Sequence, residues 1–362
     1  MPNTDYKLID LALQGGGAHG ALTWGVLDRI LEDERLEIDG ISGTSAGAMN
    51  AVVVADGLQR GGRDAARESL HTFWRAVSDA ARFSPIQRSL WDRLIGNYSL
   101  DYSPGYLFFE NLSQLLPPAK LNPFGFNPLR DLLAEQVDFE RVNVCDKTKV
   151  YVTATNVRTG RPKVFRQPDL SVDAVMASAC LPFVFKAVEI DGQAYWDGGY
   201  SGNPALYPLV DDQDCRDLVV VQINPIERQR LPDTAREILN RINEITFNSS
   251  LIKELRSIHL LHQLIDAEGL EMESYRAMRL HLIHAEQEVQ DLSASSKMNA
   301  EWSFLTLLFD KGRAWADDWL ERNFDAIGER STFDLNELFR NAIRPVDTES
   351  EAAPEAKKGS ES

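Results

Sequence analysis

The chain has 362 residues, of which 43% are hydrophobic, and it carries a formal net charge of −17 at pH 7. The hydrophobic content is enough for a sizeable core and excludes a globally disordered protein. The negative charge argues against nucleic acid and against electrostatic capture by an anionic bilayer. We therefore expect no nucleic-acid partner, and we expect any contact with lipid to be hydrophobic.

The sequence also bears on the location of the protein and on the state of its cysteines. The N-terminus lacks the basic and apolar segments of a signal peptide, and no run approaches the roughly 18 apolar residues that span a membrane. Cys145, Cys180 and Cys215 are irregularly spaced and predict neither a disulfide framework nor a metal site. We expect a cytoplasmic protein without a transmembrane segment, with reduced cysteines in its core.

Strands and helices alternate over the first 80 residues, which is typical of a parallel α/β sheet. Apolar runs predict the strands, and apolar residues spaced by three or four positions predict the helices. The expected order is a strand at 7–13, a helix at 18–31, a strand at 38–41, and helices at 46–55 and 63–80.

Residues 82–126 interrupt this alternation with nine aromatic residues and several prolines. One interpretation is an irregular packing layer over the sheet. The other is a cap that frames an apolar substrate groove. We treat 82–143 as the candidate cap segment and leave both interpretations open.

Regular structure resumes after this segment. We expect strands at 149–155, 162–166, 183–190, 193–196, 218–223 and 279–284, and helices at 171–179, 234–265 and 299–320. The run at 218–223 is apolar except for Gln222, which predicts a central strand. The last helix places Trp302 and Trp319 on one stripe, which is either core or a surface for a partner. The predicted organisation is one main α/β domain at 6–285, C-terminal helices packed on it at 286–344, and a disordered acidic tail at 345–362.

The sequence GTSAG at 43–47 is a G-x-S-x-G nucleophile elbow, preceded by an apolar strand and followed by an apolar helix. Gly43 and Gly47 are small because a strand and a helix approach closely around a sharply turned serine. Ser45 would lie at a helix N-terminus, where the helix dipole favours developing negative charge. Ser45 is therefore the candidate nucleophile.

The sequence GGGAHG at 15–20 also lies between a strand and a helix. Gly15, Gly17 and Gly20 satisfy the spacing of a dinucleotide fingerprint, with Glu37 or Asp39 as the acidic residue. The alternative is an oxyanion hole formed by backbone amides. The serine elbow 28 residues after Gly17 favours the oxyanion hole, because a dinucleotide site has no use for it.

The base of the reaction is harder to identify. A Ser-His-Asp triad needs a histidine in a loop near Ser45. The sequence places its histidines elsewhere: His71, His259 and His262 in helices, His281 and His284 in a strand, and His19 inside the glycine loop. Asp197 fits better, because it ends the strand at 193–196 and is followed by Gly198 and Gly199, which free the backbone to turn.

The three motifs, in this order, together with the stretch 177–206, resemble the bacterial patatin-like phospholipases over roughly residues 6–285. The resemblance implies a three-layer α/β/α fold with a central, mostly parallel sheet and an added C-terminal helical region. It also implies a Ser-Asp dyad without a catalytic histidine, cofactor or metal ion. Ser45 would attack an ester carbonyl and Asp197 would accept its proton. The amides of Gly15, Gly16 and Gly17 would hold the oxyanion, supported by Gly20, Gly43, Gly47, Gly198 and Gly199.

One position departs from the family pattern. The family often has arginine or lysine where His19 stands. If that side chain supports the glycine loop electrostatically, His19 does so only when it is protonated.

The function expected from the sequence is a serine lipid acyl hydrolase that acts on phospholipids or other carboxylic esters through an acyl-enzyme, peripherally on a membrane or lipid-body surface. An intracellular polyester depolymerase or thioesterase with the same dyad is one alternative. A non-catalytic scaffold that uses the tryptophan-bearing helix and the acidic tail is the other. Fluorophosphonate labelling of Ser45 separates the scaffold from both enzymes.

Overall fold

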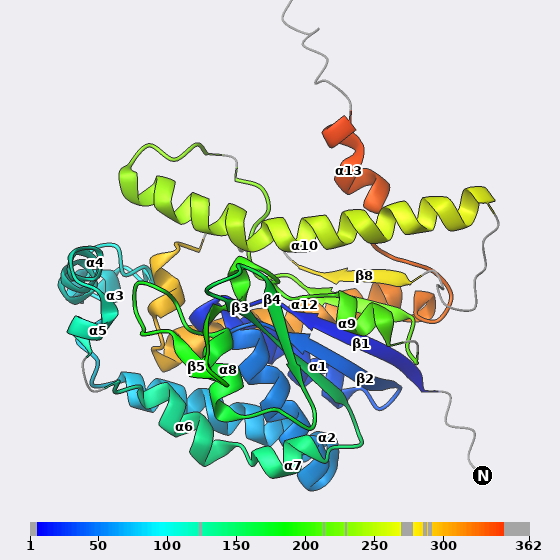
Figure 1. The fold of residues 1–362 in the computed structure, drawn as a ribbon, viewed down its shortest axis with the longest axis horizontal. Coiled ribbons are helices and arrows are strands. Elements are labelled where there is room, and N and C mark those ends of the chain that lie inside the picture. The colour runs from blue at the N-terminus through cyan, green and yellow to red at the C-terminus, as the bar shows by residue number, and fades with distance from the viewer. Residues whose placement is uncertain are drawn as a thin grey trace, which may run out of the picture.

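A computed structural model describes residues 6–122, 125–212, 214–228, 230–268, 278–284, 288 and 292–343. Its centre is a mixed sheet with helices on both faces, in agreement with the predicted α/β/α class (Figure 1). The predicted tail at 345–362 lies outside the described residues. None of the described helices combines the length and hydropathy needed to cross a membrane.

The sheet has the order β5-β6-β3-β2-β1-β7-β8, and β4 pairs with β3 outside this path. β1, β2, β3, β7 and β8 are parallel, whereas β4 and β6 run antiparallel to β3, and β5 runs antiparallel to β6. The strands are β1 (Lys7–Leu13), β2 (Leu36–Gly43), β3 (Lys149–Asn156), β4 (Pro162–Arg166), β5 (Val188–Ile190), β6 (Gln193–Asp197), β7 (Asp217–Val221) and β8 (Arg279–Ile283).

Two expectations for the strands are wrong in detail. The predicted strand at 183–190 begins only at Val188, because residues 181–185 form a turn in which the amide of Phe185 bonds to the carbonyl of Leu181. β7 lies next to the edge strand β8 rather than at the centre. The apolar residues 218–221 of β7 follow from burial on both faces, since alternate residues point to opposite sides of the sheet.

The sheet separates two hydrophobic cores. Leu11, Leu13 and Val219 point into the larger one, which is shared with α1 (Gly20–Glu32), α2 (Ala46–Ala81), α6 (Pro128–Gln136), α8 (Val172–Ser178) and α12 (Trp302–Asn323). Ala12 and Val220 point into the smaller one, which is shared with α9 (Tyr207–Asp211), α10 (Ala235–Glu268) and α13 (Leu335–Ile343). Neighbouring residues of the same strand thus place their side chains in different cores, as a pleated sheet with two covered faces requires.

α1 and α12 cross at a very short backbone separation. A Cβ atom on Gly25 would lie 2.0 Å from the carbonyl oxygen of Phe309, and one on Gly312 would lie 2.0 Å from that of Leu22. Trp319 of α12 is buried, and Trp302 is partly buried and packs against the same core. The tryptophan stripe is therefore part of the core, and its interpretation as a surface for a partner is wrong.

Gly312→Val is expected to destabilise the fold by more than about 4 kcal/mol, because the new side chain meets backbone atoms that cannot rotate away. Chemical denaturation followed by circular dichroism measures this change in the free energy of unfolding. Ala314→Val is the matched control, since Ala314 is exposed on the same helix, and it should cost less than about 1 kcal/mol. Equal unfolding midpoints for the two variants would contradict the close crossing.

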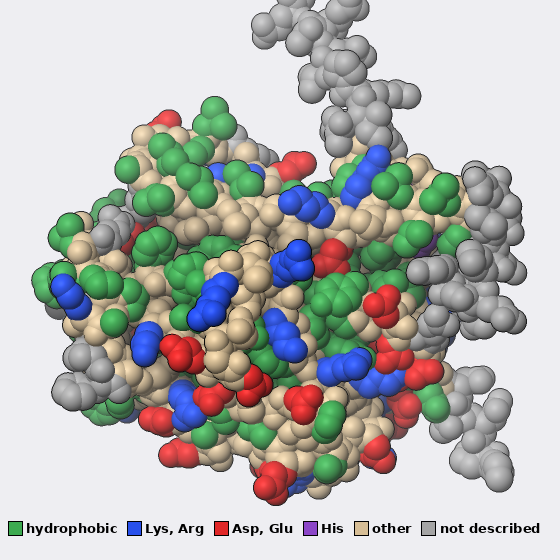
Figure 2. Space-filling view, viewed as in Figure 1, with side chains coloured by type: hydrophobic (Ala, Val, Ile, Leu, Met, Phe, Trp, Pro, Cys, Tyr) green, Lys and Arg blue, Asp and Glu red, His purple; other side chains and the backbone are tan. Residues whose placement is uncertain are grey.

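The helices predicted at 46–55 and 63–80 are joined into α2, which has a kink at Gly61 and Gly62. After α2, the segment rich in aromatic residues forms α3 (Leu90–Leu94), α4 (Pro104–Leu115) and α5 (Pro118–Leu121), and α7 (Phe139–Asn143) follows α6. Phe83, Trp91 and Phe108 are exposed, so much of this segment does not act as a packing layer. Hydrophobic side chains gather over α3–α5 and over the first half of α10 (Figure 2).

Candidate active site

Ser45 lies in the turn between β2 and α2, at the carboxyl end of the parallel strands. Its backbone has φ 54° and ψ −119°, a sparsely populated conformation for a residue with a side chain. The amide of Ser45 donates to Oγ of Ser178 at 2.8 Å, which helps to hold the turn. A Cβ atom on Gly43 would lie 2.5 Å from the carbonyl oxygen of Gly47, so the motif glycines allow the close approach that the sequence predicted.

Asp197 is the last residue of β6 and is 2% exposed. Its Oδ1 accepts a hydrogen bond from the amide of Gly199 at 2.7 Å, and the Ser45 hydroxyl donates to the same carboxylate. Gly198 has no room for a side chain, because a Cβ atom there would lie 2.0 Å from the carbonyl oxygen of Thr153. The structure thus brings Ser45 and Asp197 into direct contact.

Burial raises the pKa of Asp197 to about 6, against the lowering effects of the Gly199 amide, the Ser45 hydroxyl and the charge of Lys297. The carboxylate is therefore a stronger base than a free aspartate and is still ionised at neutral pH. This is the direction that proton abstraction from a hydroxyl requires.

The glycine loop lies directly against the nucleophile. A Cβ atom on Gly15 would lie 2.8 Å from Cβ of Ser45. Gly15 nevertheless differs from its predicted role, because its amide already donates to Oδ1 of Asn203 at 2.7 Å. In the described part of the chain no acceptor takes the amide hydrogens of Gly16 and Gly17. Gly17 has φ 59° and begins the short helix η1 (Gly17–His19).

A further amide joins this set. Ala46 is the first residue of α2, so its amide has no acceptor within its own helix. It follows the nucleophile directly, at the positive end of the helix dipole. Ala46 is not among the residues predicted from the sequence, although the G-x-S-x-G motif itself indicates this position.

Three buried amide side chains hold the glycine loop in place. Asn224 donates to the carbonyl of Gly15 at 2.7 Å, and Oε1 of Gln14 accepts from the amides of Ile223 and Asn224 at 3.0 Å each. Asn203 accepts from Gly15, as described above. None of the three is predicted from the sequence, because single polar residues in loops carry no periodic signal.

His19 is buried and neutral. Ser296 donates its hydroxyl hydrogen to the carbonyl of Ser293, so its Oγ accepts from Nε2 of His19 at 2.8 Å. Nδ1 of His19 is buried without a partner and can carry no proton at low cost. Burial, with the charges of Lys297 and Arg228, lowers the pKa of His19 well below its usual value. His19 therefore supplies no positive charge to the loop at neutral pH.

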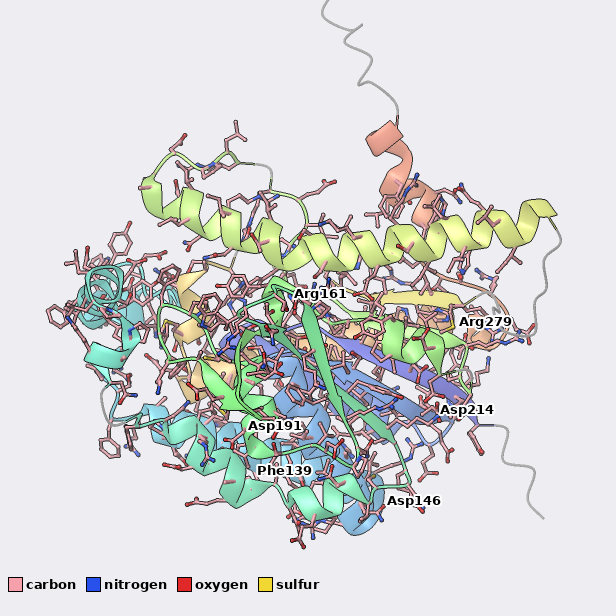
Figure 3. All side chains as sticks on the ribbon, viewed as in Figure 1. Phe139, Asp146, Arg161, Asp191, Asp214 and Arg279 are labelled. Atoms are coloured by element: carbon pink, nitrogen blue, oxygen red, sulfur yellow. The ribbon has the colours of Figure 1, made fainter. Side chains whose placement is uncertain are left out.

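His259 and His281 have partners outside the site. His259 bonds to Gln263 and stacks on Phe339, and His281 bonds to Asp217 at 3.0 Å. Arg279 also bonds to Asp217, at the end of the sheet where β7 and β8 begin (Figure 3). Ser45 lies after the carboxyl end of β2, so this cluster marks the opposite end of the sheet.

The dinucleotide interpretation fails on the positions of its acidic residues. Glu37 pairs with Leu8 near the start of β2, away from the glycine loop. The carboxylate of Asp39 bonds to the ammonium of Lys149 at 3.0 Å. Asp39, Asp212 and Asp214 form the one convergent acidic group within the described ranges, and the same lysine bonds to all three.

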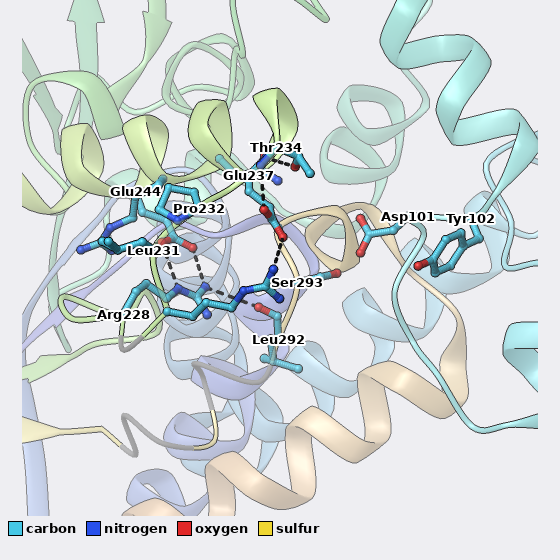
Figure 4. A pocket seen from close by; sticks show the side chains of 14 residues that line it. Asp101, Tyr102, Arg228, Leu231, Pro232, Thr234, Glu237, Glu244, Leu292 and Ser293 are labelled. Carbon is cyan, nitrogen blue, oxygen red and sulfur yellow. Dashed lines mark hydrogen bonds and ion pairs between the residues drawn. The ribbon is translucent and has the colours of Figure 1, made fainter.

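A pocket of about 510 Å³ lies beside the turn that carries Ser293 and Ala294 (Figure 4). Its wall also includes Asp101, Tyr102 and the start of α10. Three arginines and three carboxylates face it, so the lining is balanced in charge.

Comparison with known proteins places these motifs in a family. The model of the patatin-like phospholipases matches residues 11–210, more than half of the chain, and this match includes Ser45, Asp197 and the glycine loop. No curated protein matches at a significant level.

Solved structures add only distant likenesses. VipD from Legionella pneumophila has a TM-score of 0.32 and 14% identity, covering 85% of this chain and 67% of that one. ExoU in complex with SpcU, from the type III secretion system of Pseudomonas aeruginosa, has a TM-score of 0.34 and 16% identity, covering 89% of this chain and 52% of ExoU. The chain thus spans about half the length of ExoU, and at these scores the assignment rests on the family model. By that match, the chain belongs to the patatin-like phospholipase family.

Proposed function

We propose that this protein is a serine lipid acyl hydrolase with Ser45 as nucleophile and Asp197 as base. One observation carries the proposal: the Ser45 hydroxyl donates to a buried carboxylate whose pKa is raised to about 6. Family membership supports a lipid substrate. The apolar surface over α3–α5 and the first half of α10 supports contact with acyl chains at a lipid surface.

In the first half-reaction Ser45 Oγ attacks the ester carbonyl while its proton moves to Asp197. The carbonyl oxygen becomes an oxyanion, which the amides of Gly16, Gly17 and Ala46 are placed to hold. Collapse of this intermediate expels the alcohol, which takes the proton back from Asp197. An acyl group then remains on Ser45.

In the second half-reaction water attacks the acyl-Ser45 carbonyl and gives a proton to Asp197. The same amides hold the second oxyanion. Its collapse releases the fatty acid, and the departing Ser45 Oγ takes the proton back from Asp197, which restores the dyad. Asp197 needs no histidine for this sequence, because its carboxylate contacts the serine hydroxyl directly.

A fluorophosphonate probe should label the protein at Ser45, as mapped by mass spectrometry of the modified peptide, because the nucleophile is activated by Asp197. A panel of phospholipids, neutral lipid esters, thioesters and short polyesters then defines the substrate class, with phospholipid expected to be hydrolysed fastest. Faster hydrolysis of polyester or thioester would replace the lipid assignment by one of those activities. An unlabelled protein would instead favour a non-catalytic scaffold.

A further inference from the structure

The turn before α12 packs on the glycine loop. This turn is the short helix η3 (Ser295–Met298). It contacts η1, which lies far earlier in the sequence. A Cβ atom on Gly17 would lie 2.5 Å from the carbonyl oxygen of Lys297, so any side chain at Gly17 would displace the turn. Ser296 of the same turn accepts from His19. Residues 295–298 thus form one wall of the proposed oxyanion hole, although they lie outside the segment that the family model matches.

Lys297 reaches the glycine loop through a single side chain. Its Nζ donates to Oδ1 of Asn224 at 2.8 Å, and Nδ2 of Asn224 donates to the carbonyl of Gly15 at 2.7 Å. Asn224 is 1% exposed, so both bonds lie in the interior. The lysine head group is therefore held at a fixed position relative to the loop.

Lys297 also provides the cationic charge that acts on Asp197 within the described part of the chain. The neighbouring titratable groups of Asp197 are Cys180 and Tyr200, and burial raises the pKa of each to about 12, so both are neutral at physiological pH. Ser45 completes the set as a hydrogen-bond donor. Among the described residues, the charged neighbour of the ionised carboxylate is thus Lys297, a cation.

The charges around Lys297 itself are Glu244, Arg228 and Asp197, with the neutral His19 alongside. Arg228 is paired with Glu244 at 2.6 Å, on the wall of the pocket (Figure 4). Glu244 also bonds to Arg241 at 3.2 Å, so this cluster of two arginines and one glutamate carries a net positive charge. Within the described ranges, Lys297 is the member of this group whose charge acts on Asp197 itself.

We propose that Lys297 is a positioning residue of the active site, which fixes the glycine loop through Asn224 and keeps a positive charge beside the dyad throughout turnover. The proposal rests on the proposed function. In the resting state the negative charge is on Asp197. When Asp197 takes the serine proton, the negative charge moves to the oxyanion at the glycine loop, and the ammonium stabilises the charge at both places.

The pH profile of kcat/KM reports this role. Activity should rise as Asp197 ionises through its pKa of about 6, and it should fall at high pH as Lys297 loses its proton. Burial lowers the pKa of Lys297 from its usual value, which brings this second limb toward the accessible range. Without the ammonium, the pKa of Asp197 should rise, so the acidic limb should move to higher pH.

The experiment measures kcat/KM on a p-nitrophenyl ester from about pH 5 to about 10. Lys297→Met should lower activity by about 10- to 100-fold at neutral pH, less than the loss of a direct oxyanion donor. Its acidic limb should move up and its basic limb should vanish. Lys297→Arg should retain most of the activity and move the basic limb to higher pH, because arginine does not titrate there. Lys253→Met is the control, since Lys253 is exposed on α10, and its profile should match the wild type.

Wild-type limbs in folded Lys297→Met would overturn the proposal. If Lys297→Met fails to fold, Lys297→Arg decides, and an unchanged basic limb in that variant would refute the role of the ammonium. The dyad is judged separately by Ser45→Ala. If Ser45→Ala is inactive while both Lys297 variants keep wild-type limbs, only the role of Lys297 is wrong. If Ser45→Ala retains activity, the proposed function itself is wrong.

Discussion

Ser45→Ala is expected to lower kcat by about 10⁶-fold, because it removes the atom that forms the acyl-enzyme and leaves only binding and the oxyanion hole. The fold should survive, since the Ser45 hydroxyl contributes one hydrogen bond, to Asp197. Initial rates on phospholipid and on a p-nitrophenyl ester give the loss in turnover. Fluorophosphonate labelling should disappear in the same variant.

Ser257→Ala provides the matched control for this substitution. Ser257 is exposed on α10 and bonds only locally, to the carbonyl of Lys253. Its turnover should lie within about twofold of the wild type. Ser45→Ala protein that keeps more than about 1% of wild-type turnover would show that another residue is the nucleophile.

Asp197→Asn is expected to lower kcat by about 10⁴-fold, the scale seen when a catalytic carboxylate is replaced by its amide. Asparagine keeps an acceptor for the Gly199 amide, but it cannot take the proton of Ser45. The folded pKa of about 6 lies above the reference value of 3.8, so ionised Asp197 costs stability as pH rises through about 6. The variant should therefore melt at a temperature at least as high as the wild type at about pH 7.5, while losing its activity.

Two substitutions serve as controls for Asp197→Asn. Asp146→Asn removes a charge from an exposed position, labelled in Figure 3, and should leave turnover unchanged. His259→Ala should also retain turnover, because His259 bonds to Gln263 rather than to the dyad. Abolished turnover in His259→Ala would indicate a triad, and a lower melting temperature in Asp197→Asn would indicate a structural role for the carboxylate.

The alternation of short apolar strands with helices predicted a parallel α/β sheet, and the family resemblance implied its three α/β/α layers. The sequence also predicted the contact between Ser45 and Asp197, since both follow strands and are flanked by glycines that permit sharp turns. The kink at Gly61 and Gly62 in α2 falls where the sequence separated two helices. These features are local, so the pattern within a few residues determines them.

The features of the site and the sheet that the sequence does not predict depend on contacts between distant segments of the chain. Asn203, Asn224 and Lys297 are ordinary polar residues until folding places them beside Gly15 and Gly17. The occupied amide of Gly15 is a consequence of the same kind, because its acceptor lies 188 positions away in the chain. The position of β7 next to the edge strand also depends on the order of the strands, which an apolar run does not predict.

The crossing of α1 and α12 has a consequence for synthesis of the chain. Gly25 contacts Phe309, which emerges from the ribosome about 280 residues later, or roughly 15 to 60 seconds at ordinary elongation rates. During that time the apolar face of α1, with the buried Trp24, has no native partner. The turn that carries Lys297 arrives equally late. Nascent chains are therefore expected to need chaperone protection, and they acquire a complete active site only when synthesis is nearly finished.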